Sequence, residues 1–500
     1  MFAAAVAALP KPAEAQTWRF VPSISAQETV TNNVDLQPND TRQYDWVTQL
    51  TPALSVTEKG TRTRLSALLS LPVVLYAKGG SDRNSVYPAA DVLGDIALVD
   101  HWLHVEGQIS IAQQYFSPFG AQPLGLENVT QNRYRSETYR ISPYVQGVAP
   151  GNVVYELRNN NVWVNATGAP VSTSSSKYTQ FTGNASRSDT TLGWRADFDV
   201  NDTTFNGNGT HDTFRTRLVR LMPLYNIDPQ LRLLASVGYE ENDFPFDSSS
   251  NAVYGAGLEW HPTNRTSVVA KWEHRFFGAS YLFTFDHRTP LSVWNVNVSR
   301  NITSFPQQLA SLSAGADVAS LLNGLFLTAI PDPAQRQLAI DQFIRDRGLP
   351  AVLTNAVTLY SQRILLQESQ SASAGLIGVH NTVVFTIFNV RTQPISASGN
   401  VIDSVLTAAD NNRQTGVTLV WSHKLSPTMA LDTTIERLRT VANPPFEATT
   451  NQTALRLVAS TPLSPKTTVF AGARYQTFSS DVASGYNEAA AFIGVTYTFR

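Results

Sequence analysis

Long segments in which apolar and polar residues alternate strictly run through most of the chain. In 192–200 the even positions are Leu, Trp, Ala, Phe and Val, and the odd positions are Gly, Arg and Asp. The same period of two appears in 103–111, 231–240, 268–275 and 493–499, and it indicates β-strands with one apolar face. These segments are about 10 to 16 residues long, whereas strands of soluble proteins average roughly five or six. Because a strand that crosses the outer membrane needs about nine to eleven residues, the pattern predicts an all-β fold, a transmembrane antiparallel β-barrel of the outer-membrane type.

The connections between these segments alternate in length. Short connections contain Pro, Gly, Asn or Asp, which favour tight turns; they lie at 58–60, 149–151, 227–229, 261–264, 426–428 and 464–466. Longer polar loops lie at 32–42, 78–91, 117–136, 201–211, 393–412 and 441–450. Short periplasmic turns and long outer loops are typical of these barrels. We expect about 22 strands, within a range of 18 to 24, with both termini in the periplasm.

Composition excludes several other classes of protein. Only 15% of the 500 residues are charged, against about 25% in an average soluble domain. The formal net charge of −2 leaves no basic surface for nucleic acid, and the absence of cysteine excludes disulfides and thiolate metal sites. The longest strongly apolar stretch, 318–330, is shorter than the roughly 20 residues of a membrane-spanning helix.

The chain is expected to begin with the remainder of a signal peptide at 1–15. Residues 2–9 are apolar, and Ala13-Glu14-Ala15 resembles a signal-peptidase cleavage site. No linker interrupts the rest, so 16–500 is expected to be a single barrel.

A segment at 305–350 departs from the period of two and predicts a helical insert in one outer loop. Asp332-Pro333 supplies a helix start, and Gly348 with Pro350 supplies a stop. The sequence leaves two placements open. The insert either folds into the lumen or over the mouth, or it forms an external hairpin. The expected polarity of the lumen wall disfavours deep apolar burial there.

The alternation also places charged side chains on the inner face of the predicted barrel. Ten acidic and eight basic residues share this face: Glu106, Arg140, Glu156, Arg158, Arg195, Asp197, Asp199, Arg232, Glu240, Glu259, Lys271, Glu273, Arg275, Asp432, Glu436, Arg456, Arg474 and Glu488. Opposite charges inside a barrel either pair across strands and stiffen the wall or line a water-filled path. Their near balance predicts weak ion selectivity.

The sequence offers no constellation of catalytic or cofactor-binding residues. The eight histidines are dispersed, several beside turns, and no hydrolase, nucleotide or zinc-protease motif is present. We therefore expect no enzyme activity, no cofactor and no metal site.

Several stretches resemble a family of outer-membrane β-barrels associated with PEP-CTERM and exopolysaccharide systems. They are WRFVPSISAQETVTNNVDL from Trp18, SPFGAQP (117–123), ETYRISPYVQG (137–147) with YELR (155–158), YLFTFDHRTPLSVWNVNVSRNITSFPQQ (281–308) and PDPAQRQLAIDQFIRDRGLP (331–350). The resemblance implies an outer-membrane location and a link to surface polysaccharide or protein-sorting loci. It implies no reaction and no catalytic residues.

These observations predict a passive, porin-like channel or export conduit of the cell outer membrane, linked to exopolysaccharide systems. The expected partners are outer-membrane lipid and polysaccharide or polysaccharide-export components, without nucleic acid. The alternative is a non-conducting structural or surface-assembly barrel whose outer loops bind a partner. A membrane-embedded hydrolase is a third, weaker hypothesis. The permeant and the oligomeric state are left open.

Overall fold

The computed structural model describes residues 17–78, 81–168, 171–207, 210–245, 247–312, 336, 361–395 and 408–499. The predicted signal peptide and most of the predicted helical insert lie outside these residues. Within them, no helix is long and apolar enough to cross a membrane.

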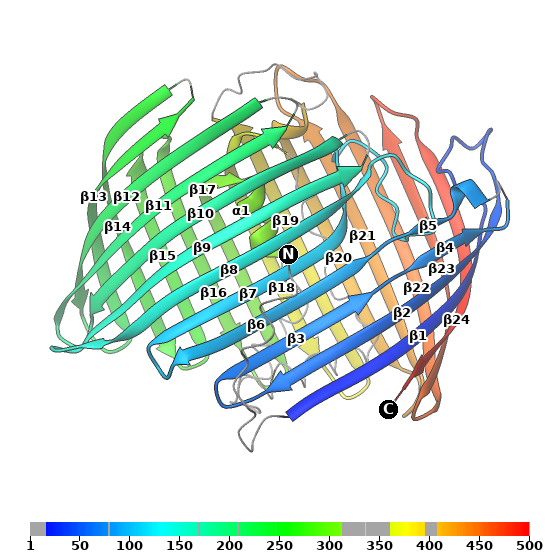
Figure 1. Cartoon of the computed structure of the whole chain (residues 1–500), viewed down its shortest axis with the longest axis horizontal. Helices are drawn as coiled ribbons and strands as arrows, with labels where there is room; N and C mark the ends of the chain where they lie inside the picture. Colours follow the sequence, from blue (N-terminus) through cyan, green and yellow to red (C-terminus); the bar gives the residue numbers. More distant parts are fainter. Residues whose placement is uncertain are drawn as a thin grey trace, which may run out of the picture.

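The described chain folds almost entirely into β-strands (Figure 1). The strands are β1 (Thr17–Thr31), β2 (Asp45–Lys59), β3 (Thr63–Ser70), β4 (Val73–Tyr76), β5 (Ser85–Val86), β6 (Ala89–Val99), β7 (Leu103–Tyr115), β8 (Arg133–Ala149), β9 (Val153–Gly168), β10 (Val171–Arg187), β11 (Leu192–Gly207), β12 (Thr210–Asn226), β13 (Leu231–Phe244), β14 (Asp247–Thr263), β15 (Thr266–Arg275), β16 (Gly278–Arg288), β17 (Ser292–Ser304), β18 (Ile364–Ile377), β19 (Asn381–Pro394), β20 (Asn412–Lys424), β21 (Ala430–Ala442), β22 (Thr449–Ser464), β23 (Thr467–Ser480) and β24 (Tyr486–Thr498). Two helical pieces accompany them, a 3-10 turn η2 (Ser81–Arg83) and the helix α1 (Phe305–Leu312).

The sheet closes into a barrel because β1 pairs antiparallel with both β2 and β24. Strands β3 and β4 follow one another along the same edge of β2 and form a single barrel strand that breaks at Pro72, which cannot donate a ladder hydrogen bond. β5 pairs with β4 and β6 with β3, so they make the next strand. The closed antiparallel barrel therefore has 22 strands, as predicted.

The two ends of the barrel differ in their connections. β1 begins and β24 ends at the same end, which we call the terminal end; its connections have two to five residues. Short turns face the periplasm in barrels of this type. Loops 32–44 and 116–132 leave the opposite end, which we call the loop end.

The prediction of an outer loop at 201–211 is wrong. β11 continues to Gly207, and β12 begins at Thr210. The polar residues here sit on paired strands, where Asp202 bonds Arg215 (2.6 Å) and Asn206 bonds His211 (2.6 Å). Cross-strand polar pairs therefore let the hairpin continue where composition alone indicates a loop.

The outer face of the barrel is apolar and carries exposed aromatic residues near both ends of its apolar belt, as the alternation predicts. Toward the terminal end these are Trp18, Trp102, Trp194, Tyr225, Trp260, Trp294, Trp421 and Tyr497. Toward the loop end they are Trp46, Trp163, Tyr239, Tyr254, Trp272 and Tyr475. Such aromatic girdles mark the two membrane–water interfaces.

Candidate functional site

The inner face of β7 to β15 carries ion pairs that join neighbouring strands. Arg140 bonds Glu106 (2.5 Å), Arg158 reaches the other oxygen of Glu106 (2.9 Å), and Arg158 also bonds Glu156 (3.0 Å). These side chains are 16 to 33% exposed, so water reaches them from the barrel interior. The arrangement is a strap of alternating charges across three strands.

The strap resumes on β11 to β15. Arg195 bonds Asp197 (2.8 Å). Arg220 lies 3.7 Å from Asp197 and 2.9 Å from Glu273, so it bridges β11 and β15 from the strand β12. Glu259 lies between two cations, at 3.1 Å from Arg232 and 3.8 Å from Lys271.

Two further groups of this wall are more enclosed. Arg275 pairs with Glu240, and Glu240 is fully buried. Asp199 accepts hydrogen bonds from Gln180 (2.8 Å) and Asn201. The wall from β7 to β15 thus satisfies its charges with partners on nearby strands.

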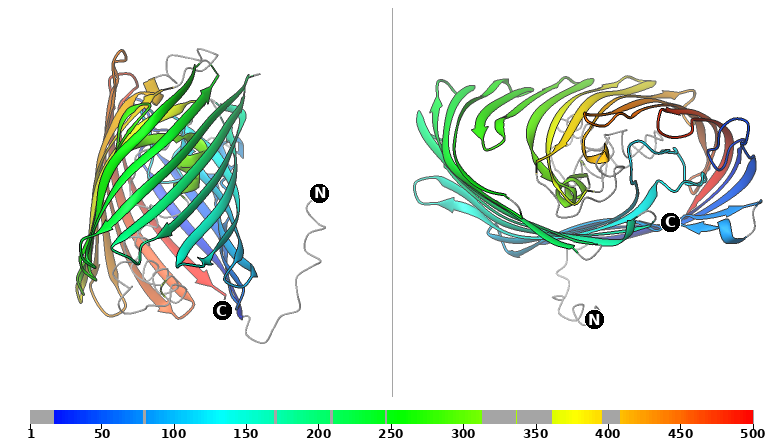
Figure 2. Two further views of the ribbon diagram at one scale, coloured as in Figure 1. Left: turned by 90° about the vertical axis from the view of Figure 1, so that its left-hand side faces the viewer. Right: turned by 90° about the horizontal axis from the view of Figure 1, so that it is seen from above.

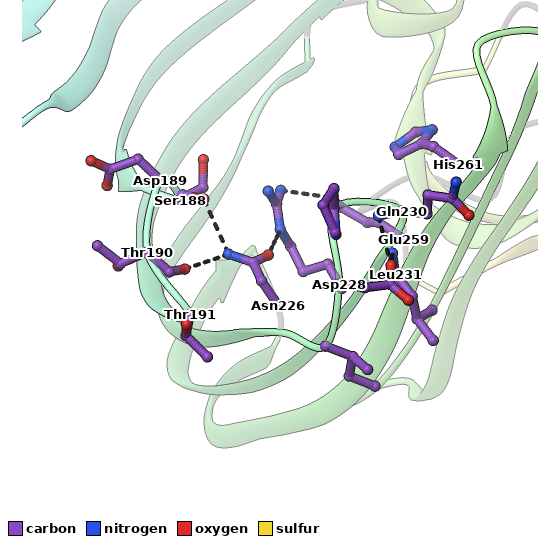
Figure 3. A pocket seen from close by; sticks show the side chains of 13 residues that line it. Ser188, Asp189, Thr190, Thr191, Asn226, Asp228, Gln230, Leu231, Glu259 and His261 are labelled. Atoms are coloured by element: carbon purple, nitrogen blue, oxygen red, sulfur yellow. Dashed lines mark hydrogen bonds and ion pairs between the residues drawn. The ribbon is translucent and has the colours of Figure 1, made fainter.

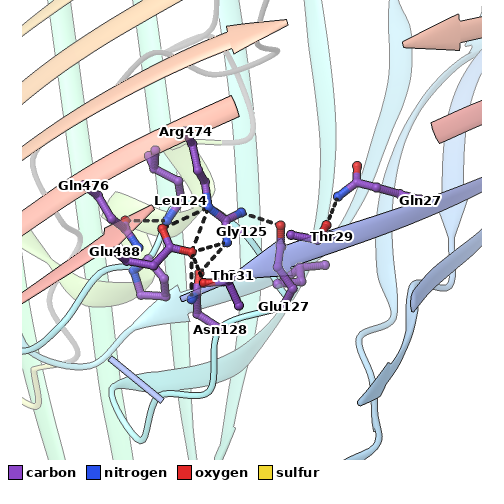
Figure 4. A network of polar contacts seen from close by, with 12 residues as sticks. Gln27, Thr29, Thr31, Leu124, Gly125, Glu127, Asn128, Arg474, Gln476 and Glu488 are labelled. Carbon is purple, nitrogen blue, oxygen red and sulfur yellow. Dashed lines mark hydrogen bonds and ion pairs between the residues drawn. The ribbon is translucent and has the colours of Figure 1, made fainter. Parts of the chain in front are cut away.

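The opposite wall is organised around Arg474, in a network with Glu127, Asn128, Glu488 and Thr31 (Figure 4). Arg474 donates to Glu488 (2.9 Å), to Asn128 (2.9 Å) and to Glu127. Thr31 donates to Glu488 (2.7 Å). The side chains of Arg474, Glu127 and Glu488 are at most 5% exposed, so this network is buried.

Glu127 and Asn128 belong to the loop 116–132, which folds inward (Figure 2, right). The loop reaches β22 and β23 through Gln452, which donates to the Gln122 carbonyl (2.6 Å), and Gln476, which accepts from Leu124 N (3.4 Å). A Cβ at Gly125 would lie 2.0 Å from a Glu127 oxygen. A side chain at this position would therefore push the Glu127 carboxylate away from Arg474, and glycine leaves it in place.

The helix α1 also lies within the barrel, against β8, β9, β10 and β17 (Figure 2). Its start is a capping box, in which the Gln307 side chain accepts from Ser304 N (2.8 Å). Gln307 also donates to the Tyr178 hydroxyl on β10 (2.9 Å). Phe305 and Leu309 are 1% and 3% exposed, so α1 is docked rather than external.

The expectation that the lumen wall is polar throughout is wrong near the loop end. Phe305 and Leu309 pack into an apolar cluster whose other buried members are Phe116, Tyr134, Val162, Val164, Ala166, Tyr178, Phe205, Phe214, Phe244 and Ile364. On β9, the inner positions change from Glu156 and Arg158 to Val162 and Val164 along one strand. The inner face therefore changes from charged to apolar toward the loop end, and this gives α1 a surface to bury against.

A polar recess of ≈ 510 Å³ opens at the terminal end, between the turns that follow β10 and β12 (Figure 3). Asn226 closes one side, since it donates to the carbonyls of Ser188 (3.1 Å) and Thr190 (2.5 Å). Its side-chain oxygen accepts from Arg232 (2.7 Å). Because these polar groups hydrogen-bond to one another, we attribute the recess to the geometry of the two turns.

The structure brings all eighteen of the sequence-predicted interior charges into the two walls. The first wall holds Glu106, Arg140, Glu156, Arg158, Arg195, Asp197, Asp199, Arg232, Glu240, Glu259, Lys271, Glu273 and Arg275, and the second holds Asp432, Glu436, Arg456, Arg474 and Glu488. Arg456 is the cross-strand partner of Arg474, and its guanidinium lies 5.3 Å from the Phe492 ring centre. That these residues line a permeation path remains a prediction.

Sequence reasoning missed Arg220 and Glu127. β12 is apolar on both faces, with Leu218 and Met222 inside and Val219 and Leu221 outside, so no alternation shows which way Arg220 points. Glu127 lies in a loop, where no period applies. Among the described residues, no group of three or more His, Asp or Glu side chains is placed to hold a metal ion.

No protein-family model matches the chain, and no curated protein matches it in sequence. Solved structures do match in fold. The apoprotein form of the FrpB iron transporter from Neisseria meningitidis (F5-1 variant) aligns with a TM-score of 0.52 and 9% identity, over 96% of this chain and 81% of that one. A second structure of the same FrpB variant gives a TM-score of 0.50 and 9% identity, over 96% and 82%.

At such low identity the likeness shows the fold alone. Together with the closed 22-strand sheet and the two aromatic girdles, it identifies the chain as a β-barrel of the outer membrane.

Proposed function

We propose that this barrel is a passive channel whose aqueous path is narrowed by the loop 116–132 and by α1. The observation that carries the proposal is the strap of partly exposed ion pairs from β7 to β15, such as Arg140–Glu106 and Arg158–Glu156. Charges that remain hydrated need water along the inner wall. Both inward elements dock on walls of the same interior, so they restrict the path that this water fills.

The inner wall also carries amides suited to sugar hydroxyls. Asn160 bonds Gln180 (3.0 Å), and Gln180 bonds Asp199. Amides and carboxylates of this kind offer both donors and acceptors. Together with the sequence resemblance to barrels of PEP-CTERM and exopolysaccharide systems, they support an export conduit for a polysaccharide as the finer form of the proposal. No reaction is proposed.

A second candidate is a non-conducting structural or surface-assembly barrel whose outer loops bind a partner. It is favoured by the apolar cluster around Phe305 and Leu309, which fills part of the interior toward the loop end. An apolar interior core of this kind excludes water from its part of the cross-section.

Single-channel recording in planar bilayers separates the two functions. The full-length protein is expected to conduct, with weak preference between cations and anions. Glu127→Gln weakens the anchor of the loop 116–132 and is expected to raise the conductance. Glu137→Gln is the matched control, because Glu137 bonds Arg135 (2.9 Å) on the outward face of β8. Absence of current from the wild type and from Glu127→Gln alike would overturn the channel in favour of the structural barrel.

A further inference from the structure

Four arginines gather on the outward face of β19, β20 and β21 near the loop end. We call Arg391, Arg413, Arg437 and Arg439 the arginine patch. Arg391 shares the face of the exposed Phe385 and Ile387, which belong to the apolar belt. On β20 and β21, Arg413, Arg437 and Arg439 are exposed. The patch therefore projects away from the barrel interior.

The strand register crowds these charges together. Arg391 and Arg413 are direct cross-strand partners. Arg439 lies opposite Thr415, two residues along β20 from Arg413, and Arg437 is two residues further down the same face of β21. Like charges in such positions destabilise a sheet unless a counter-charge is present.

No described carboxylate forms an ion pair with any member of the patch. With the Gln393 amide turned so that its oxygen faces the guanidinium, Arg391 Nε donates to that oxygen (3.1 Å). Its cross-strand neighbour Glu368 is already bonded to Arg300 (2.9 Å).

Elsewhere on the loop-end rim, outward arginines are paired. Arg215 bonds Asp202 (2.6 Å), and Arg217 bonds Glu241 (2.9 Å). Among the residues that the structure describes, the arginine patch is thus an unbalanced positive surface beside a rim in which Arg215 and Arg217 are neutralised.

The patch lies just beyond the apolar belt. On β21, Arg437 follows the exposed Ile435 by two residues. On β20, Trp421 of the terminal-end girdle and Arg413 are eight residues apart. Eight residues of a strand tilted by about 40° span roughly 20 Å across the membrane, close to the height of an apolar belt. The patch therefore lies at the level of the outer-leaflet headgroups.

We propose that the arginine patch binds the phosphate groups of phosphorylated glycolipids in the outer leaflet of the outer membrane. Arginine presents a planar fork of donors that matches phosphate oxygens. The lipid phosphates supply the counter-charge that the described residues do not, and the acyl chains lie along the apolar belt below.

The test compares two double variants of the full-length barrel in detergent. Arg413→Gln/Arg439→Gln removes half of the patch. Arg215→Gln/Arg217→Gln removes two outward arginines of the same rim that are already paired. Each is titrated with diphosphoryl lipid A, with the dephosphorylated lipid and with inorganic phosphate, and bound lipid is counted by native mass spectrometry. Heat-modifiable gel mobility confirms folding, and Arg437→Gln alone replaces the patch double variant if that variant does not fold.

The patch variant is expected to lose affinity for diphosphoryl lipid A by on the order of tenfold, and the rim variant by less than about twofold. The wild type is expected to bind the dephosphorylated lipid weakly and to keep its lipid in millimolar phosphate. Equal losses in the two double variants, or equal binding of the two lipids, would overturn the proposal. Displacement by inorganic phosphate would show a general anion site and overturn the lipid assignment.

Discussion

The two walls of the barrel interior satisfy their charges in different ways. From β7 to β15 the partners lie on nearby strands, as in Arg140–Glu106 and Arg220–Glu273. On the opposite wall, Arg474 depends on Glu127 and Asn128, which reach it from a loop about 350 residues earlier in the chain. The first wall is therefore a property of the sheet, whereas the second is completed only when the loop 116–132 is in place.

The two walls should differ most in how much stability is lost when one arginine is removed from each. Arg474→Met leaves Glu127 and Glu488 buried without their cation, so we expect a loss of about 3–5 kcal/mol in the free energy of unfolding. Arg232→Met is the counterpart, because Arg232 is 31% exposed and Glu259 keeps Lys271; we expect a loss within about 1 kcal/mol. Guanidinium titration followed by tryptophan fluorescence measures both, and similar losses would contradict the distinction between the walls.

A second variant tests whether α1 is held as an apolar plug rather than by polar contacts. Leu309→Asp places a charge in the apolar cluster, and we expect it to undock α1 at a cost of roughly 2 kcal/mol or more. Hydrogen exchange of 305–312 should rise, and so should conductance. Val129→Asp is the control, because Val129 is 37% exposed in the loop 116–132. Unchanged exchange in Leu309→Asp would mean that the apolar contacts do not hold the helix.

A third variant asks whether the first wall faces the conducting water. Glu273→Lys changes the inner charge by two at a residue bonded to Arg220, and it should shift the reversal potential in a salt gradient toward anions. Glu368→Lys makes the same change on the outward face, where Glu368 bonds Arg300, and should leave the potential in place. Equal shifts of the reversal potential in the two variants, or no shift in either, would show that the first wall does not face the conducting water.

The smallest effect concerns Asp410, in the loop between β19 and β20. Burial raises its pKa to about 7, although Ser361 and Arg363 oppose this shift. The folded loop therefore binds a proton that the unfolded chain has lost, so its stability is greatest at acidic pH and falls as pH rises toward 7. Exchange of the 408–411 amides, corrected for intrinsic rates, should be slower at pH 5 than at pH 8. Asp410→Asn should abolish this difference, and a persisting difference would assign it to another group.

The sequence indicated the barrel because its strands alternate over more residues than a soluble sheet requires. Lys271, Glu273 and Arg275 show the correct face by period alone. The alternation does not show which way Arg220 points, because both faces of β12 are apolar around it. It also does not show that β11 and β12 continue through polar residues such as Asp202 and Asn206, where composition predicts a loop.

The positions of the loop 116–132 and of α1 could not be predicted from the sequence for a different reason. The position of Glu127 depends on Arg474, and the docking of Phe305 depends on apolar inner residues of distant strands. Such long-range partners leave no local signature. The sequence therefore predicts helix within 305–350, of which the structure describes α1, but it does not predict how deep α1 lies in the barrel.

The seam between β1 and β24 determines the order in which the molecule can be assembled. Its partners, such as Ser23 and Thr498, stand at opposite ends of the chain. The Arg474 network sits over this seam, with Thr31 on β1, Glu488 on β24 and Asn128 from the loop. The loop 116–132 is synthesised early and bonds Asn33 and Val34 near the N-terminus, but it gains its contacts with Arg474, Gln476 and Glu488 only when β23 and β24 arrive. The complete set of loop contacts therefore requires a complete barrel, and a chain cut before β23 would form an open sheet in which this loop lacks its buried cation, Arg474.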